Sequence, residues 1–304
     1  MEIIKKVVTE NENGMRLDAA VSIINEEISR NVAQNLIKEG KILLDEKVAK
    51  ASAKVKTNQV ISMPDNVEQK IDEKLVAEDI PLDIIYEDDD IIVINKPKDM
   101  VVHPAAGNWS GTLVNAMLGK HELSDENGEF RPGIVHRLDK NTTGVMVVAK
   151  NNNAHAKLAK QIQEHNFKKI YVALVKGVIK ENEAIIELPV GRHPTDRKKM
   201  AVVKDGRYAY TKIKVLERFN GYTYIEVELK TGRTHQIRVH MSHIGYPIVG
   251  DDTYSNGKNP FGVTSQMLHS RTLGITHPTT GEYMEFNAPI PEEFENVLKK
   301  LREE

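Results

Sequence analysis

Apolar and polar positions follow two different patterns along the chain, and the change comes near residue 64. In residues 15–63, apolar residues recur twice at helical spacing and then form two short runs that are typical of strands. Gly40 follows the second helical pattern, where a glycine commonly ends a helix. We therefore predict a small α/β module, with helices marked by Leu17, Val21 and Ile24 and by Val32, Leu36 and Ile37, and strands at 42–44 and 60–61.

From about residue 84, strand-like runs outnumber helical ones, which indicates an α+β fold. We predict strands at Ile91–Asn95, Val145–Ala149, Lys169–Val175, Ala209–Leu216 and Tyr222–Leu229. We predict helices at Thr112–Leu118, Asn153–His165 and Thr234–Ile244, and a C-terminal helix marked by Phe294, Val297, Leu298 and Leu301. In the third helix, Thr234 is expected to cap the start and Gly245 the end.

An acidic segment separates the two regions. Residues 65–83 show little periodicity, which predicts a linker between a module at 1–64 and a main domain at 84–304. Residues 65–90 contain eleven Asp or Glu and two Lys, a local net charge of −9. Because the whole chain has a formal charge of −2, the other residues together carry +7. The near-neutral total therefore does not exclude binding to a polyanion.

Composition excludes several classes of protein. The chain has no cysteine, so it has neither disulfides nor thiolate metal ligands. It contains no apolar run of the roughly 20 residues that a membrane-spanning helix needs. Its first residues lack the apolar core of a secretory signal. We expect a cytoplasmic protein, monomeric and not bound to a membrane.

One polar loop carries the clearest chemical signal. The run His136–Gly144 precedes the apolar strand predicted at 145–149 and places Asp139 between the cations Arg137 and Lys140. A carboxylate at the end of a strand, with cations beside it, is a candidate nucleophile. The alternative is a loop that contains only salt bridges.

This loop, HRLDKNTTG, resembles the catalytic motif of RluA/RluD-type RNA pseudouridine synthases. Three further motifs of that family follow its order: Asn95-Lys96-Pro97 with His103-Pro104, Lys169-Ile170-Tyr171, and the arginine motif Leu229–His240. The N-terminal region resembles the S-four-type RNA-binding module, although Leu44-Asp45-Glu46 stands where members usually have Val-Asn-Gly. The resemblance is strongest to the RluD-like branch. It implies an N-terminal RNA-binding module and a catalytic domain built on a mixed, mostly antiparallel sheet with flanking helices.

The resemblance also implies a reaction and its residues. The protein would be an isomerase that converts uridine to pseudouridine in structured RNA, with Asp139, Tyr171 and Arg238 as catalytic residues. Arg233 competes with Arg238 as the partner of Asp139. Attack on the sugar, attack on the base and a glycal route all stay open. Residues expected to contact RNA are Arg137, Arg233, His136, Lys96, Arg16, Arg30, Lys38, Arg197 and Lys198.

The expected partner is large-subunit (23S) ribosomal RNA, and no cofactor or metal is expected. Two alternatives are a transfer-RNA pseudouridine synthase and a non-catalytic RNA-binding factor of ribosome assembly. A third is a metal-dependent hydrolase built on His235, His240, His243 and the pair Asp251-Asp252. On a helix, however, these histidines point in directions that do not suit one tetrahedral site.

Overall fold

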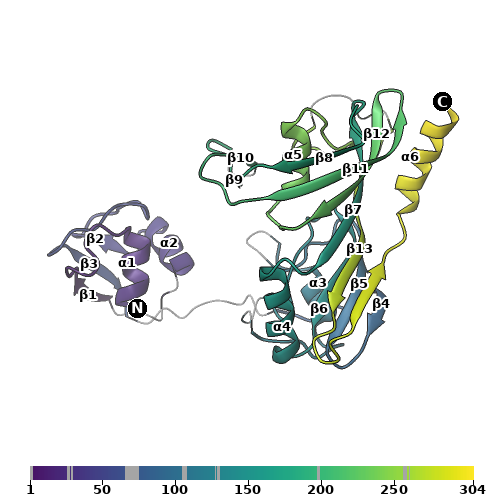
Figure 1. The fold of residues 1–304 in the computed structure, drawn as a ribbon. Helices are drawn as coiled ribbons and strands as arrows, with labels where there is room; N and C mark the ends of the chain where they lie inside the picture. The colour runs from purple at the N-terminus through teal and green to yellow at the C-terminus, as the bar shows by residue number, and fades with distance from the viewer. Residues whose placement is uncertain are drawn as a thin grey trace. The chain divides into compact units, whose positions relative to one another are not determined.

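The computed structural model describes residues 3–25, 28, 30–65, 75–104, 108–126, 128, 131–196, 199–255, 259 and 261–304. The chain divides into two compact units, Met1–Lys74 and Leu75–Glu304 (Figure 1). Among the described helices, none combines the length and the apolar character needed to cross a bilayer.

The first unit is a three-stranded antiparallel sheet with two helices. Its elements are β1 (Ile3–Val7), α1 (Leu17–Ile24), α2 (Arg30–Lys38), β2 (Leu43–Leu44) and β3 (Val60–Pro64). The strand order is β1-β3-β2. Leu17 and Val21 of α1 and Ile37 of α2 are buried with Ile61 and Met63 of β3 in one core. Gly40, with φ of 70°, ends α2 as expected.

The turn after β2 has an unusual backbone. Asp45 and Glu46 both adopt left-handed conformations, with φ of 50° and 61°. Such a conformation costs a residue with a Cβ about 1–2 kcal/mol. The Asp45 carboxylate compensates, because it accepts hydrogen bonds from the backbone of Val60 at 2.8 Å and from the side chain of Gln59 at 2.7 Å. Glu46 makes only an exposed ion pair with Lys5.

The second unit is built on a nine-stranded sheet. Its strands are β4 (Asp83–Glu87), β5 (Ile91–Lys96), β6 (Thr143–Ala149), β7 (Lys168–Lys176), β8 (Glu183–Glu187), β11 (Tyr210–Phe219), β12 (Tyr222–Leu229), β13 (Leu268–Thr276) and β14 (Tyr283–Asn287). The order is β4-β5-β6-β13-β7-β12-β11-β8, and β14 pairs with β13. Among the described strand pairs of this sheet, β6 and β13 alone run parallel. A separate hairpin consists of β9 (Val190–Arg192) and β10 (Met200–Val202).

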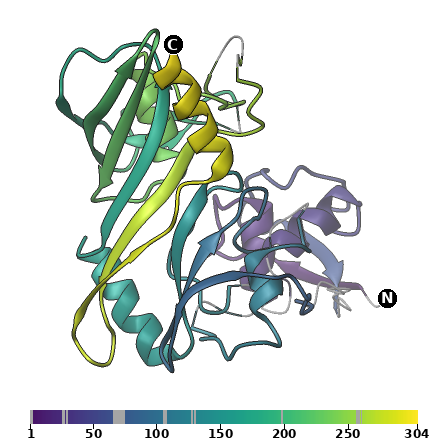
Figure 2. The same cartoon turned by 90° about the vertical axis from the view of Figure 1, so that its right-hand side faces the viewer.

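Helices cover both faces of this sheet. They are α3 (Leu113–Met117), α4 (Asn152–Gln163), α5 (Gln236–His243) and α6 (Glu292–Glu303). Val145 and Val147 of β6 share a core with α4, whereas Met146 and Val148 share a core with α3. Successive residues of a strand point to opposite faces, so β5 and β6 are apolar throughout because both of their faces are covered. α6, yellow in Figure 2, packs on β12 through the contact of Phe294 with Tyr224.

Strand β13 joins distant parts of the chain. It lies between β6 and β7, so that its residue Ser270 pairs with Gly144 on one side and with Tyr171 on the other. Gly144 has φ of 111°, and a Cβ at this position would clash with the backbone of Ser270. The close approach of β13 to the start of β6 therefore requires glycine. This arrangement brings the loop before β6 next to Tyr171.

The α+β prediction is confirmed, and every predicted strand and helix is present, with bounds that differ by at most three residues. Two details of the prediction are wrong. The residue before α5 is His235 in a left-handed conformation, so Thr234 does not cap this helix, although Gly245 does end it. Leu75, Ile80 and Leu82, which were assigned to the linker, pack against the core of the second unit. Residues 66–74 of that predicted linker lie outside the described residues.

We expect the substitution Glu46→Gly to stabilise the first unit by up to about 1 kcal/mol. Glycine removes the cost of the left-handed backbone, and this gain exceeds its extra freedom in the unfolded chain, which costs about 0.5–1 kcal/mol. The lost ion pair with Lys5 is exposed and contributes little. Native-state hydrogen exchange of the β2 and β3 amides in the full chain measures the effect.

Glu39→Gly is the matched control, because Glu39 also forms an exposed ion pair with a lysine, Lys41. Its backbone is not left-handed, so glycine removes no backbone strain at this position. We expect faster hydrogen exchange of the same amides and a less stable unit. Equal effects of the two substitutions would contradict the role assigned to the turn.

Candidate active site

Asp139 lies in the loop that leads into β6, and three contacts fix this loop. Its neighbour Leu138 is buried in the core of the second unit. The backbone N–H of Thr142 donates to the carbonyl oxygen of Asp139 at 3.1 Å and closes a turn. Nζ of Lys96 donates to the carbonyl oxygen of Lys140 at 3.0 Å. The Asp139 side chain, 17% exposed, is thus held at the end of a buried strand.

The expectation that Lys96 contacts RNA is wrong. Lys96 is completely buried, and its ammonium also donates to the carbonyl oxygens of Pro97 at 2.7 Å and Met100 at 2.9 Å. All three donors are therefore used within the protein. Burial lowers the pKa of Lys96 to about 7, and the charge of Asp139 opposes this shift. Lys96 therefore stabilises the loop from the protein interior instead of binding a ligand.

Arg238, on α5, contacts two carboxylates at once. Its Nη1 donates to Oδ2 of Asp139 at 3.0 Å, which is the pairing expected from the sequence. Its Nε and Nη2 donate to the two oxygens of Asp251 at 2.7 and 2.9 Å. Burial alone would lower the pKa of Arg238, but the hydrogen bonds and charges of Asp251 and Asp139 raise it above the ordinary value. The guanidinium is therefore charged and fixed in direction.

The sequence analysis missed Asp251 as the second partner of Arg238 and considered it only as a metal ligand. Asp251 is 2% exposed, and its Oδ1 also accepts hydrogen bonds from the backbone of Thr253 and Tyr254. The signal was present in the apolar run Ile248-Val249 just before it. Such a run indicates a buried segment, and a carboxylate that is buried with it needs a cation.

Tyr171 lies on β7 with its ring buried next to Asp139. Burial raises the pKa of its hydroxyl to about 12, a hydrogen bond with Ser270 opposes the shift, and the charge of Asp139 adds to it. The phenol is therefore protonated at neutral pH. It can offer a flat ring face and a hydrogen-bond donor to a neighbouring group.

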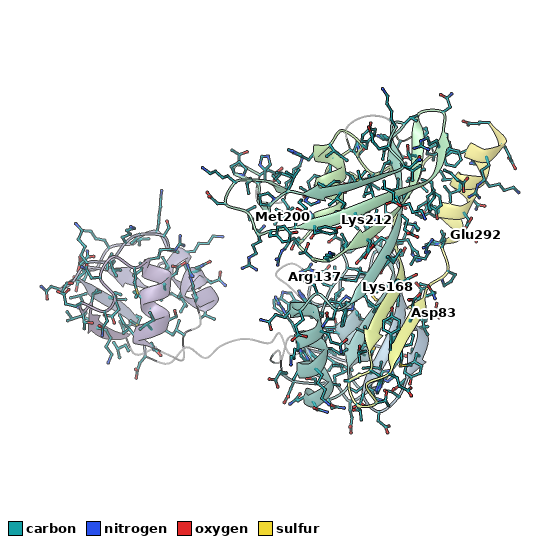
Figure 3. All side chains as sticks on the ribbon, in the orientation of Figure 1. Asp83, Arg137, Lys168, Met200, Lys212 and Glu292 are labelled. Atoms are coloured by element: carbon teal, nitrogen blue, oxygen red, sulfur yellow. The ribbon has the colours of Figure 1, made fainter. Side chains whose placement is uncertain are left out.

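A pocket with a cavity volume of about 80 Å³ lies beside these groups. Asp139, Tyr171 and Arg238 all line it, together with residues from the loop before β6 and the loop before α5. Arg137, labelled in Figure 3, is exposed and lines the same pocket. Arg233 also lines it, but its Nε donates to the carbonyl oxygen of Tyr208 at 2.9 Å. Of the two arginines considered for Asp139, only Arg238 contacts it.

His235 is a neighbour that the sequence analysis did not assign to the site. Its Nε2 lies 3.9 Å from Oδ1 of Asp139, and its Nδ1 lies 2.8 Å from the hydroxyl of Tyr254. Burial lowers its pKa, and the charge of Asp139 opposes this shift. Its left-handed backbone is a strained conformation of the kind that recurs at functional sites.

The histidines of the hydrolase alternative do not come together. His240 is completely buried, with Nδ1 at 2.9 Å from the hydroxyl of Thr211 and Nε2 at 2.9 Å from the carbonyl oxygen of Leu188. Both ring nitrogens therefore face other protein groups. Within the described part of the chain, His235, His240, His243, Asp251 and Asp252 do not form a cluster with the spacing of metal ligands.

His136 has a structural contact. Its Nε2 accepts the backbone N–H of Val147 at 3.0 Å, and burial lowers its pKa to about 3, so the ring is neutral. The same ring lines a second pocket beside the first. Arg197 and Lys198, expected to bind RNA, lie outside the described residues.

In the first unit, a buried carboxylate organises the expected RNA contacts. Asp18 accepts hydrogen bonds from Nε and Nη2 of Arg16 at 3.0 and 2.8 Å, and Nε of Arg30 lies 3.5 Å from its Oδ2. The hydrogen bonds from Arg16 lower the pKa of Asp18 to about 2. Both arginines and Lys38 are exposed. Asp18 therefore holds the two arginines in place.

Comparisons with known proteins bear on both units. The RNA pseudouridylate synthase family matches residues 90–243, and the S4 domain matches residues 15–61. The uncharacterized RNA pseudouridine synthase YlyB of Bacillus subtilis is 41% identical over 303 residues, covering 99% of each chain. Ribosomal large subunit pseudouridine synthase D of Pseudomonas aeruginosa is 44% identical over 303 residues, covering 96% of this chain and 93% of its own.

A solved structure agrees with these sequence matches. Human RNA pseudouridylate synthase domain containing 1 superimposes with a TM-score of 0.58 and 25% identity, covering 74% of this chain and 96% of its own.

We expect the free energy of unfolding of His136→Gln to fall less steeply than that of the wild type as the pH is lowered. The pKa of His136 in the folded chain, about 3, lies below the ordinary 6.5, so the unfolded chain binds more protons between these values. Stability therefore falls as the pH drops from about 6.5 towards 3, by up to about 1.4 kcal/mol per pH unit for one group. Glutamine accepts the Val147 N–H without titrating.

Urea unfolding at pH 7, 6 and 5, followed by the fluorescence of Trp109, measures this slope in the second unit. Trp109 is the only tryptophan of the chain. His243→Gln, at an exposed histidine of α5, is the control and should keep the wild-type slope. A variant at position 136 that loses stability as steeply as the wild type would show that His136 does not contribute.

Proposed function

The chain belongs to the RNA pseudouridylate synthase family, and we propose that it acts on large-subunit ribosomal RNA with Asp139 as its catalytic carboxylate. It is an RNA pseudouridine synthase and therefore an isomerase. The observation that carries the site assignment is the 3.0 Å ion pair of Arg238 with Asp139 in a pocket that Tyr171 also lines.

The reaction rearranges its substrate without adding or removing atoms. The N-glycosidic bond of uridine breaks, the base rotates, and a carbon of the base bonds to the same sugar. This carbon loses its proton, and the nitrogen released from the sugar gains one. No electrons are gained or lost overall, so the chemistry needs no redox cofactor. A carboxylate that acts on the sugar or the base, or assists elimination to a glycal, fulfils the central requirement. We assign this role to Asp139.

The neighbours of Asp139 have matching roles in this proposal. Arg238 donates a hydrogen bond to Asp139 and supplies the positive charge beside this carboxylate. Asp251 positions Arg238 by a bidentate contact. Tyr171 stacks against the target base and donates a hydrogen bond from its protonated hydroxyl.

A uridine within structured RNA must leave its stack before its sugar reaches Asp139. This eversion costs a few kcal/mol. Arg137 is exposed, lines the pocket, and makes no hydrogen bond or ion pair with the described residues. We assign it to the space that the everted base vacates, where its guanidinium can stack on neighbouring bases.

Two features support ribosomal RNA as the target. The full-length relatives include proteins named ribosomal large subunit pseudouridine synthase D, at 40–44% identity. The first unit also matches the S4 domain and presents the exposed cations Arg16, Arg30 and Lys38, which suit contacts with phosphates. We propose that the protein works in the cytoplasm as a monomer.

Mapping pseudouridine across total cellular RNA, with and without this protein, tests the target. Loss of one or more sites in large-subunit ribosomal RNA is the expected result. Loss of sites only in transfer RNA would replace the proposed target, and an unchanged map would reject the proposal.

We expect Asp139→Asn to abolish pseudouridine formation while RNA affinity changes little, because the amide keeps the shape of the side chain and loses its charge. Single-turnover product formation and filter binding on the mapped RNA measure the two effects. Asp89→Asn, an exposed aspartate outside the pocket, is the control and should retain wild-type rates. Retention of a substantial rate by the variant at position 139 would end its assignment.

We expect Asp251→Asn to lower kcat by about 100-fold with little change in KM, because a misdirected Arg238 no longer orients Asp139. The neighbouring Asp252→Asn is the matched control: its side chain is 82% exposed, and its Oδ1 lies 3.8 Å from Nη2 of Arg238. It should reduce kcat far less. A loss confined to KM would assign Asp251 to RNA binding instead of to positioning.

A further inference from the structure

Lys169 is a buried lysine next to the active site. It precedes Tyr171 by two positions on β7, and alternate residues of a strand point to the same face. Lys169 is 8% exposed and lines the second pocket, as does Tyr171. Its neighbour Lys168 points to the other face, where 46% of its side chain is exposed and its Nζ pairs with Glu285 at 2.8 Å. The two lysines therefore have opposite environments.

Lys169 lacks a counter-ion. Its ammonium makes no hydrogen bond or ion pair with any residue that the structure describes, and its Nζ lies beside Gly232, 4.0 Å from where a Cβ would stand. Burial lowers the pKa of Lys169 to about 8, and the charge of Arg233 adds to this shift. A buried and unpaired ammonium is costly in an isolated protein. It is favourable only when a ligand supplies the missing negative charge.

The second pocket suits an anion. Its cavity volume is about 510 Å³, and its titratable lining residues are Arg131, Arg137, Lys169, Lys230, Arg233, His103, His136, His165 and Tyr171. No Asp or Glu is among its described lining residues. A concave surface lined by cations raises the local concentration of anions. This cationic lining contrasts with the net charge of −2 of the chain.

The two pockets share a wall. Arg137, Tyr171, Leu229, Gly232 and Arg233 line both. A uridine whose sugar reaches Asp139 therefore has the next part of its backbone close to the second pocket. Each nucleotide of an RNA strand is linked to the next by a phosphate. A phosphate next to the target uridine can therefore enter the second pocket while the base of that uridine occupies the first.

We propose that the second pocket binds one phosphate group of the RNA backbone next to the target uridine, with the Lys169 ammonium as its central ligand and Arg233 beside it. This inference rests on the proposed function for the identity of the RNA. The phosphate supplies the charge that the pocket lacks, and it fixes the position of the target sugar relative to Asp139.

The experiment uses the full chain and a stem-loop RNA that contains the mapped uridine. In one series of RNAs, each phosphate near this uridine is replaced in turn by an uncharged methylphosphonate. Binding is measured for the wild type, Lys169→Met, Lys169→Arg and the control Lys168→Met. We expect one methylphosphonate to weaken wild-type binding by about 10-fold, Lys169→Met to weaken binding equally, and the two changes together to cause no further loss.

Two further measurements separate this role from a structural one. Loss of one phosphate contact should lower the slope of log K against log salt concentration by about 1 in Lys169→Met but not in Lys168→Met. Removal of an unpaired buried charge should also raise the melting temperature of the free protein, whereas removal of a structural lysine would lower it. Lys169→Arg keeps the charge and should retain most of the affinity.

The outcomes distinguish the alternatives. The inference would be overturned if every methylphosphonate weakened RNA binding by Lys169→Met as much as it weakens binding by the wild type. It would also be overturned if Lys169→Met had the RNA affinity and the salt slope of the wild type. Binding of inorganic phosphate that requires Lys169, without coupling to any RNA linkage, would replace the RNA phosphate by a free anion. Failure of the wild type to form pseudouridine in any RNA would instead reject the proposed function, which this binding experiment does not measure.

Discussion

The guanidinium of Arg238 lies between the carboxylates of Asp139 and Asp251, and the chemistry of the pocket depends on this arrangement. Asp251 is buried and takes two of the donors, so it determines the direction of the third. Asp139 is the more exposed carboxylate and receives that third donor. One guanidinium thus pairs with both a buried carboxylate and a second carboxylate that is partly exposed in the pocket. A lysine could not replace it, because a single ammonium lacks the planar fork that addresses both partners.

The sheet brings Asp139, Tyr171 and Arg238 together. The loop with Asp139, the strand with Tyr171 and the helix with Arg238 come from three distant parts of the sequence. The insertion of β13 between β6 and β7 brings the first two together through Ser270. Glycine at position 144 permits this close approach, and Lys96 supports the loop from the interior by bonding to its backbone. Electrostatics and packing therefore act on the same few residues.

Much of this arrangement could be predicted from the sequence. Strands β5, β6, β7 and β12 carry long apolar or alternating runs, so their periodicity was sufficient to find them. The strands β1, β4, β8, β9, β10 and β14 were not predicted, because they are short or largely exposed and therefore carry few buried apolar positions. Strand β13 was not predicted either, because its polar residues 269–272 interrupt the apolar pattern, although the strand is buried. Motif residues found Asp139 and Arg238, but a motif does not report burial. Lys96 was therefore misassigned, and the pairing of Asp251 became visible only when the fold brought it to Arg238.

The position of β13 also has a consequence for folding during synthesis on the ribosome. Residues 268–276 are synthesised more than a hundred residues after the loop that contains Asp139, yet they form the strand that pairs with the end of that loop at Gly144. Contacts of such long range form late in folding. A nascent chain that has exposed only its first 250 residues already carries Asp139, Tyr171 and Arg238, but it lacks the strand that brings them into register. If the proposed site acts, this chain can therefore modify RNA only after β13 has been synthesised.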